Sequence, residues 1–178
     1  SKMETIERRV EEAIRESEEL NERDEERVKK VIDELKKLID DIRRRLEEAL
    51  RELKKVTDDG SPREDIDRKI KTVLRELEEL IKRIRERIKE ILRENEKTVR
   101  DDRRRNEELR AELKKLVDEG AVTEEILKKV RELIEETKRR TDDLHKKVKE
   151  RVDDIKRRLD ELLEEAKRAL DEIRERVK

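Results

Sequence analysis

Aliphatic residues recur along most of the chain at the spacing of one face of an α-helix. Steps of 18 residues, which are five turns of an undistorted helix, connect aliphatic positions in each third of the chain: Val10, Val28 and Leu46; Val73, Ile91 and Leu109; Ile134, Val152 and Leu170. A strict seven-residue repeat fails sooner. The pattern therefore predicts nearly straight helices rather than a strong left-handed supercoil.

The two glycines, Gly60 and Gly120, divide the chain into near-equal thirds, and no other strong helix breaker interrupts the segments. The sequence predicts helices over about 2–58, 62–118 and 124–177, each roughly 80 Å long at about 1.5 Å per residue. Each apolar stripe is wide enough to contact two neighbours. We therefore expect an all-α fold: one domain over 1–178, a single-chain antiparallel up-down-up three-helix bundle of undetermined handedness.

The residues beside the glycines are those that end and begin helices. In "TDDGSPREDI", Gly60 can adopt the left-handed conformation that ends a helix, and Ser61 with Glu64 has the spacing of a capping box. Pro62 then suits the first helical position. In "DEGAVTEEIL" we expect Thr123 to cap the third helix, with Val122 packed on Leu127. Ser1 and Glu4 show the same capping-box spacing.

Polar residues replace aliphatic ones on the inner face of each predicted helix, at matching heights. If the helices reverse near Gly60 and Gly120, Ser17 faces Asp102, which faces Thr137 or its neighbour. Asn21 faces Thr98, which faces Thr141, and Asp24 faces Asn95, which faces His145. Asn106, one turn beyond, can reach back toward Ser17. The predicted network comprises Ser17, Asn21, Asp24, Asn95, Thr98, Asp102, Asn106, Thr137, Thr141 and His145.

We interpret this alignment as a connected hydrogen-bond network inside the bundle. A buried polar group is costly unless it finds partners, so polar residues belong in a core together or not at all. A slip of one turn would leave each of them facing aliphatic groups. The network is thus expected to specify the register of helices whose uniform aliphatic layers tolerate several alignments. Within it, we expect His145 to be buried and bonded to Asp24 or Asn95.

The composition excludes several functional classes. Charged residues form 60% of the chain, but 53 Lys and Arg balance 54 Asp and Glu, so no net field attracts nucleic acid. With no cysteine there is no disulfide framework or thiolate nucleophile. No apolar run approaches the roughly 20 residues that span a bilayer. We expect a monomer without membrane, nucleic-acid or other partners, soluble and cytoplasmic if expressed recombinantly.

Two kinds of chemistry deserve comparison with this pattern. Ser17, His145 and either Asp24 or Asp102 suggest a hydrolase, but the register places Ser17 about two turns, roughly 10 Å, from His145. A metal site would need more ligands than one histidine and one aspartate. We therefore expect no enzymatic activity, no catalytic residue, no cofactor and no metal.

The whole chain resembles de novo designed three-helix bundles built from straight helices with buried hydrogen-bond networks. The resemblance rests on the idealised caps, the "GS" and "GA" turns, the Leu/Ile/Val core, the Glu/Lys/Arg surface and the absence of aromatic residues. It implies a hyperstable scaffold without natural function. The alternative is the framework of a pH- or partner-responsive switch or of a designed binder.

Overall fold

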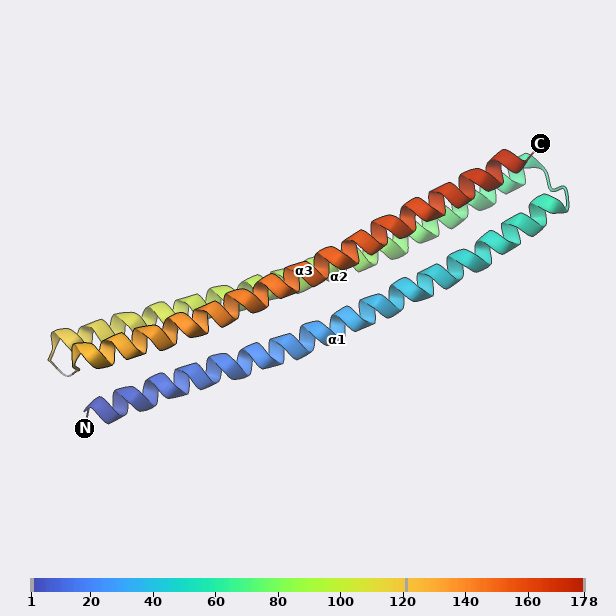
Figure 1. The fold of residues 1–178 in the computed structure, drawn as a ribbon. Helices are drawn as coiled ribbons and strands as arrows, with labels where there is room; N and C mark the ends of the chain where they lie inside the picture. Colours follow the sequence, from blue (N-terminus) through green and yellow to red (C-terminus); the bar gives the residue numbers. More distant parts are fainter. Residues whose placement is uncertain (1, 121, 178) are drawn as a thin grey trace. The chain divides into compact units, whose positions relative to one another are not determined.

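The computed structural model describes residues 2–120 and 122–177, with side chains from residue 4 onward. Figure 1 traces the chain as three long helices joined by two short turns: α1 (Lys2–Asp58), α2 (Arg63–Asp118) and α3 (Glu124–Arg176). No strand occurs in this part of the chain. The prediction of an all-α three-helix bundle is confirmed. The capping role expected of Ser1 lies outside the described residues.

The first turn is closed by a Schellman motif. The amide of Gly60 donates to the carbonyl of Thr57 at 3.1 Å, and the amide of Ser61 donates to the carbonyl of Val56 at 3.2 Å. Gly60 has a φ of 82°, in the left-handed region that glycine enters without steric cost. These bonds satisfy carbonyls that the end of α1 leaves without helical partners.

The start of α2 differs from the sequence prediction by one residue. The carbonyl of Pro62 accepts the first helical hydrogen bonds, from the amides of Asp65 at 3.1 Å and Ile66 at 3.2 Å. Pro62 is therefore the N-cap, not the first helical residue, and Ser61 lies outside the helix. The reason is the shortness of the turn, because Ser61 is already engaged in closing α1.

The second turn agrees more closely with the sequence prediction than the first turn does. Gly120 has a φ of 72°, and its amide donates to the carbonyl of Val117 at 2.9 Å. The carbonyl of Thr123 accepts the amide of Leu127 at 3.1 Å, which makes Thr123 the N-cap of α3. Val122 is buried in an aliphatic cluster against which Leu127 packs, as a hydrophobic staple requires.

The helices divide into two compact units, which we describe separately. The polar unit comprises residues 1–29 and 91–150, and the aliphatic unit comprises residues 30–90 and 151–178. The single domain predicted over 1–178 remains a prediction. In both units the apolar stripes of the three helices face inward, because burying them removes aliphatic surface from water.

In the polar unit, contacts between helices show how they run. Arg9 of α1 pairs with Glu112 of α2, whereas Arg27 further along α1 pairs with Glu94. Rising numbers on α1 thus meet falling numbers on α2, so the two helices are antiparallel. The core of this unit contains a cluster of buried aliphatic residues: Ile6, Val10, Leu113, Val122, Val130 and Ile134.

The core of the aliphatic unit holds no buried polar residue among those described. One of its clusters joins Leu53, Ile66, Ile70, Leu170 and Ile173. Ion pairs such as Arg85 with Asp160 connect α2 to α3 at the surface, where each is worth at most about 1 kcal/mol. Stability in this unit therefore comes from aliphatic burial.

Candidate functional site: a buried polar cluster

All five buried polar residues found in the described chain lie in the polar unit: Ser17, Asn95, Asp102, Thr137 and Thr141. They come from all three helices. Each replaces an aliphatic residue on the inner stripe, so its side chain points toward the other two helices rather than toward water. Their burial makes hydrogen-bond partners obligatory, because an unpaired buried polar group costs about 1–3 kcal/mol.

Asp102 of α2 stands at the centre of this cluster, with only 7% of its surface exposed. Its Oδ1 accepts a hydrogen bond from the hydroxyl of Ser17 on α1 at 2.9 Å. Its Oδ2 accepts one from the hydroxyl of Thr141 on α3 at 2.7 Å. One carboxylate therefore joins all three helices, and no lysine, arginine or histidine pairs with it in the described part of the chain.

Thr141 also connects α3 to α1. Its Oγ1 accepts a hydrogen bond from Nδ2 of Asn21 at 3.1 Å. The same oxygen lies 3.1 Å from the carbonyl of Thr137. A hydroxyl has one hydrogen to donate, and the shorter contact directs it to the Asp102 carboxylate, which is the stronger acceptor. Asn21, Thr141, Asp102 and Ser17 thus form one connected chain of hydrogen bonds.

A second, separate contact joins α2 and α3. Nδ2 of Asn95 lies 2.6 Å from Nδ1 of His145. Asn95 is buried, whereas His145 is half-buried. With Asn95 donating, Nδ1 must be the unprotonated acceptor and the imidazole must be neutral. The contact therefore depends on the protonation state of the ring.

Burial is the main cause that lowers the pKa of His145, because it disfavours the charged imidazolium. The ammonium of Lys149 lowers this pKa further. The carboxylates of Glu96 and Asp142 act in the opposite direction, and Arg103 adds a smaller lowering effect. The net shift is downward, which favours the neutral ring that the bond from Asn95 requires.

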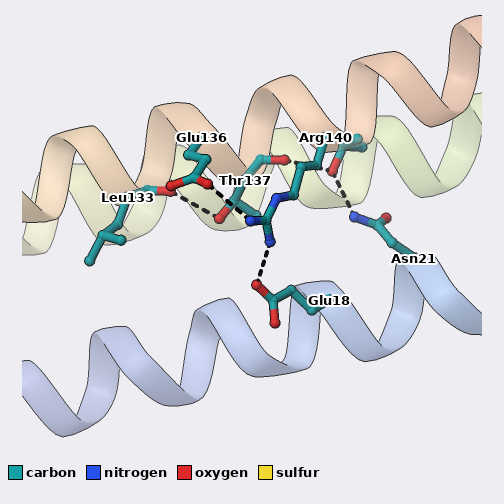
Figure 2. A network of polar contacts seen from close by, with 7 residues as sticks. Glu18, Asn21, Leu133, Glu136, Thr137 and Arg140 are labelled. Carbon is teal, nitrogen blue, oxygen red and sulfur yellow. Dashed lines mark hydrogen bonds and ion pairs between the residues drawn. The ribbon is translucent and has the colours of Figure 1, made fainter.

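An ion-paired layer covers part of this cluster. Figure 2 shows Arg140 of α3 extending to Glu18 of α1, with Nη1 of Arg140 2.7 Å from Oε1 of Glu18. Its Nη2 lies 2.9 Å from Oε1 of Glu136, one turn back on α3. The same view shows Asn21 directed from α1 toward α3. Because the arginine side chain is mostly solvated, these ion pairs add little to the free energy of unfolding.

The structure places four predicted network residues differently from the register argument. Thr98 and Thr137 donate to the carbonyls of Glu94 and Leu133, each four residues back on its own helix. Threonine hydroxyls commonly make this bond when the helix offers a nearby carbonyl. Thr98 therefore does not connect Asn21 to Thr141, which bond each other directly. Thr137 lies in the core without joining another helix through its hydroxyl.

Asp24 and Asn106 are the other two predicted network residues that the structure places differently. Asp24 is half-buried, and its carboxylate lies 3.4 Å from Nη2 of Arg27 on the same helix, rather than near Asn95 or His145. Pairing with a neighbouring arginine while remaining partly hydrated costs a carboxylate less desolvation free energy than full burial does. Nδ2 of Asn106 is buried without a hydrogen-bond partner, so Asn106 does not reach back to Ser17.

Sequence reasoning missed the surface layer formed by Glu18, Glu136 and Arg140. The signal available was the spacing of Glu136 and Arg140, four residues apart on one helix face. The link to Glu18 had no comparable signal, because charged residues occupy most of the outer positions of α1. Only the side-by-side placement of α1 and α3 selects this glutamate among many.

Comparisons with known proteins add the following. No protein-family description matches the chain, and no curated protein matches it. Among solved structures, it is similar to one described as a "Computationally designed three helix bundle". The two share 21% sequence identity with a TM-score of 0.39, and the match covers 98% of this chain and 83% of that one.

The described residues include no group of three His, Asp or Glu side chains arranged to hold a metal ion. None of the described helices combines the length and the apolar character needed to cross a membrane. In the cluster around Asp102, hydroxyl, amide and carboxylate groups form hydrogen bonds with one another.

Proposed function

We propose that the chain is a designed structural scaffold without natural biochemical function, in which the polar cluster specifies the register of the helices. The observation that carries this proposal is the Asp102 carboxylate, which accepts hydroxyl hydrogen bonds from α1 and α3. Moving any one helix by a turn would break at least one of these bonds and bury the carboxylate against aliphatic groups. Such a penalty rejects wrong alignments.

The partners of the polar residues support a non-catalytic role. A serine nucleophile needs a base within hydrogen-bond reach, usually an imidazole. The Ser17 hydroxyl instead donates to Asp102, and the imidazole of His145 is engaged with Asn95. These residues are used to hold helices together. The designed origin is supported by the idealised caps, the near-equal helices and the composition of the chain.

The proposal is tested by replacing the bonded cluster with aliphatic residues: Ser17→Ala, Asn21→Leu, Asn95→Leu, Asp102→Leu and Thr141→Val together. Spin labels at the exposed positions of Glu11 and Lys97, which are offset from each other along the helix axis, then report the alignment of α1 with α2. We expect one narrow distance in the native cluster. In the aliphatic variant we expect further distances, displaced by roughly 4 Å, because a slip of one helical turn moves one label by about 5.4 Å along the axis.

Stability should not fall in that variant, because exchanging a buried polar group together with its partners for packed aliphatics is often neutral or stabilising. A single unchanged distance in the aliphatic variant would show that aliphatic packing alone fixes the register, which contradicts the proposal. A marked loss of stability with an unchanged distance would assign the cluster to stability instead.

A pH-responsive joint is a second candidate function, and the contact between Asn95 and His145 favours it. Protonation of Nδ1 converts the acceptor of this bond into a donor, which opposes the donating amide. Because the Asp102 cluster is separate from this contact, the response would be confined to the α2–α3 contact. The pH dependence of the free energy of unfolding tests it.

A further inference from the structure

An apolar groove runs between α1 and α2 of the aliphatic unit. Two adjoining hollows, with volumes of about 380 Å³ and about 200 Å³, share Ile42, Arg45, Leu80 and Arg83 and thus form one groove. Leu38 lies in its wall with 48% of its surface exposed, the larger value of the two exposed large hydrophobics found in the described chain.

The charged residues beside this groove follow a sign order. On α2, Glu76 and Glu79 come first and Arg83 and Arg87 follow. Adjacent positions of the α2 rim thus change from acidic to basic between residues 79 and 83. On the α1 rim, Glu34 comes before Leu38, and Asp41 and Arg45 come after it. Asp41 pairs with Arg44 of its own helix, which leaves Glu34 and Arg45 as the acidic and basic ends of this rim.

These charges are not used to close the groove. In the polar unit, ion pairs of Arg9 with Glu112 and of Arg27 with Glu94 bridge α1 and α2. Within the described part of the aliphatic unit, no ion pair bridges these helices, and the arginines on the opposite rims, Arg45 and Arg83, carry like charges. Arg87 pairs only with Glu90 of its own helix, at 3.1 Å. The rim is therefore available to an outside surface.

The sign order is self-complementary under a two-fold rotation. If two copies face each other with antiparallel helices, an axis that passes α2 midway between residues 79 and 83 places Glu79 opposite Arg83 of the second copy. The same axis places Glu76 opposite the second copy's Arg87. Leu38 and Leu80 line the same stretch of groove, so the axis passes α1 beside Leu38, between Glu34 and Arg45. Glu34 of each copy then faces Arg45 of the other copy.

We propose that this α1–α2 face is a docking surface for a second copy of the chain, forming an antiparallel two-fold dimer with Leu38 near its axis. The pairing buries the exposed leucines of both copies. It leaves Asp41 paired with Arg44 and sets a charge of the other sign opposite each of the remaining rim charges: Glu34, Arg45, Glu76, Glu79, Arg83 and Arg87. A contact of about three helical turns is at the small end of specific interfaces, so the dimer is weak. The chain remains a monomer at low concentration, as the composition predicts.

Sedimentation equilibrium of the full chain at low salt tests the pairing, over concentrations from about 10 μM to about 1 mM. The mass should rise from 21.8 kDa toward twice that value. Leu38→Glu should hold it at the monomer value. Leu133→Glu is the matched control, because Leu133 is the other exposed large hydrophobic, at 42%, and lies in the polar unit. A monomer mass at every concentration, or equal effects of both substitutions, would overturn the proposal.

Charge exchange tests the antiparallel arrangement. Arg83→Glu sets two carboxylates against each other across the axis and should weaken association at least about tenfold. The double variant Glu79→Arg with Arg83→Glu restores opposite charges at both contacts and should recover the native association. Failure of this recovery, with the helical circular dichroism of both variants unchanged, would overturn the arrangement. Added salt should weaken the native dimer, because the charges are exposed.

Discussion

The hydroxyl of Thr141 on α3 donates a hydrogen bond to Oδ2 of Asp102 on α2 over 2.7 Å, while its oxygen accepts one from Asn21 on α1. This single side chain therefore contacts polar groups on both other helices. The second carboxylate oxygen of Asp102 is held by Ser17. Without the Thr141 hydroxyl, Oδ2 of Asp102 would lose a donor and Nδ2 of Asn21 would lose an acceptor. Little water reaches this site to replace them.

Thr141→Val should destabilise the protein by about 1–3 kcal/mol, because it keeps the side-chain shape and leaves Asp102 and Asn21 less well satisfied. Guanidinium unfolding of the variant and the parent measures this difference. Thr98→Val is the matched control, since the Thr98 hydroxyl bonds only the Glu94 carbonyl of its own helix. The control should change stability by less than about 0.5 kcal/mol. Equal effects would contradict the connected cluster.

The sequence could predict which heights of the three helices carry polar groups, but not how each side chain is used. Register alone places Ser17 opposite Asp102 and Asn95 opposite His145, and hydrogen bonds join both pairs. Thr98 lies near the expected height, yet its hydroxyl bonds its own helix. Periodicity determines the direction of a Cβ atom, whereas the choice between a local carbonyl and a distant partner depends on the rotamer and on competing acceptors.

The helix ends were predictable for a different reason. A positive φ without strain is available to glycine, so Gly60 and Gly120 specify where α1 and α2 end. The one-residue error at Pro62 arose because Ser61 was suited to two roles, closing α1 or capping α2. Sequence patterns do not decide between two favourable local hydrogen-bond arrangements when the turn is this short.

The lowered pKa of His145 predicts a definite pH dependence. At a pH above the unfolded-state pKa of about 6.5, the ring is neutral in both states and its contribution to stability is complete. As the pH falls through that value, the unfolded chain binds the proton before the folded chain does. The free energy of unfolding should therefore decrease between about pH 7.5 and about pH 5.5.

NMR titration of this single imidazole should show a midpoint below that of a model peptide. In denaturation measurements over the same pH range, His145→Gln should make the free energy of unfolding depend less steeply on pH. The substitution removes the titrating imidazole and leaves the carboxylates in place. A histidine midpoint at or above the peptide value would contradict both the burial of the ring and the donating role of Asn95.

Substitution of Gly60 separates backbone strain from crowding. A Cβ atom at this position would meet nothing within 4 Å, so a side chain has space. The φ of 82° nevertheless disfavours any L-residue with a Cβ atom. Gly60→Ala should cost about 1–2 kcal/mol of unfolding free energy. Gly60→Asn should cost less, since asparagine tolerates this conformation best after glycine. Equal costs for both variants would point to a different cause.

Thermal unfolding should require extreme conditions. The inner faces of all three helices bury aliphatic residues along both units, and hydrogen bonds in the two turns satisfy carbonyls at the ends of α1 and α2. We expect the helical circular dichroism signal to persist to about 95 °C, beyond the range of ordinary domains. A cooperative transition near about 55 °C would contradict this prediction.

In the described part of the chain every buried polar residue lies in the polar unit, and this confinement also has a kinetic consequence. Local helical contacts form quickly, and layers of leucine, isoleucine and valine accept several alignments with small differences in energy. From the proposed role of the cluster, we expect a chain that collapses one turn out of alignment to be destabilised because Asp102 does not meet its two hydroxyl donors. The slowest refolding step should then be the sliding of misaligned helices.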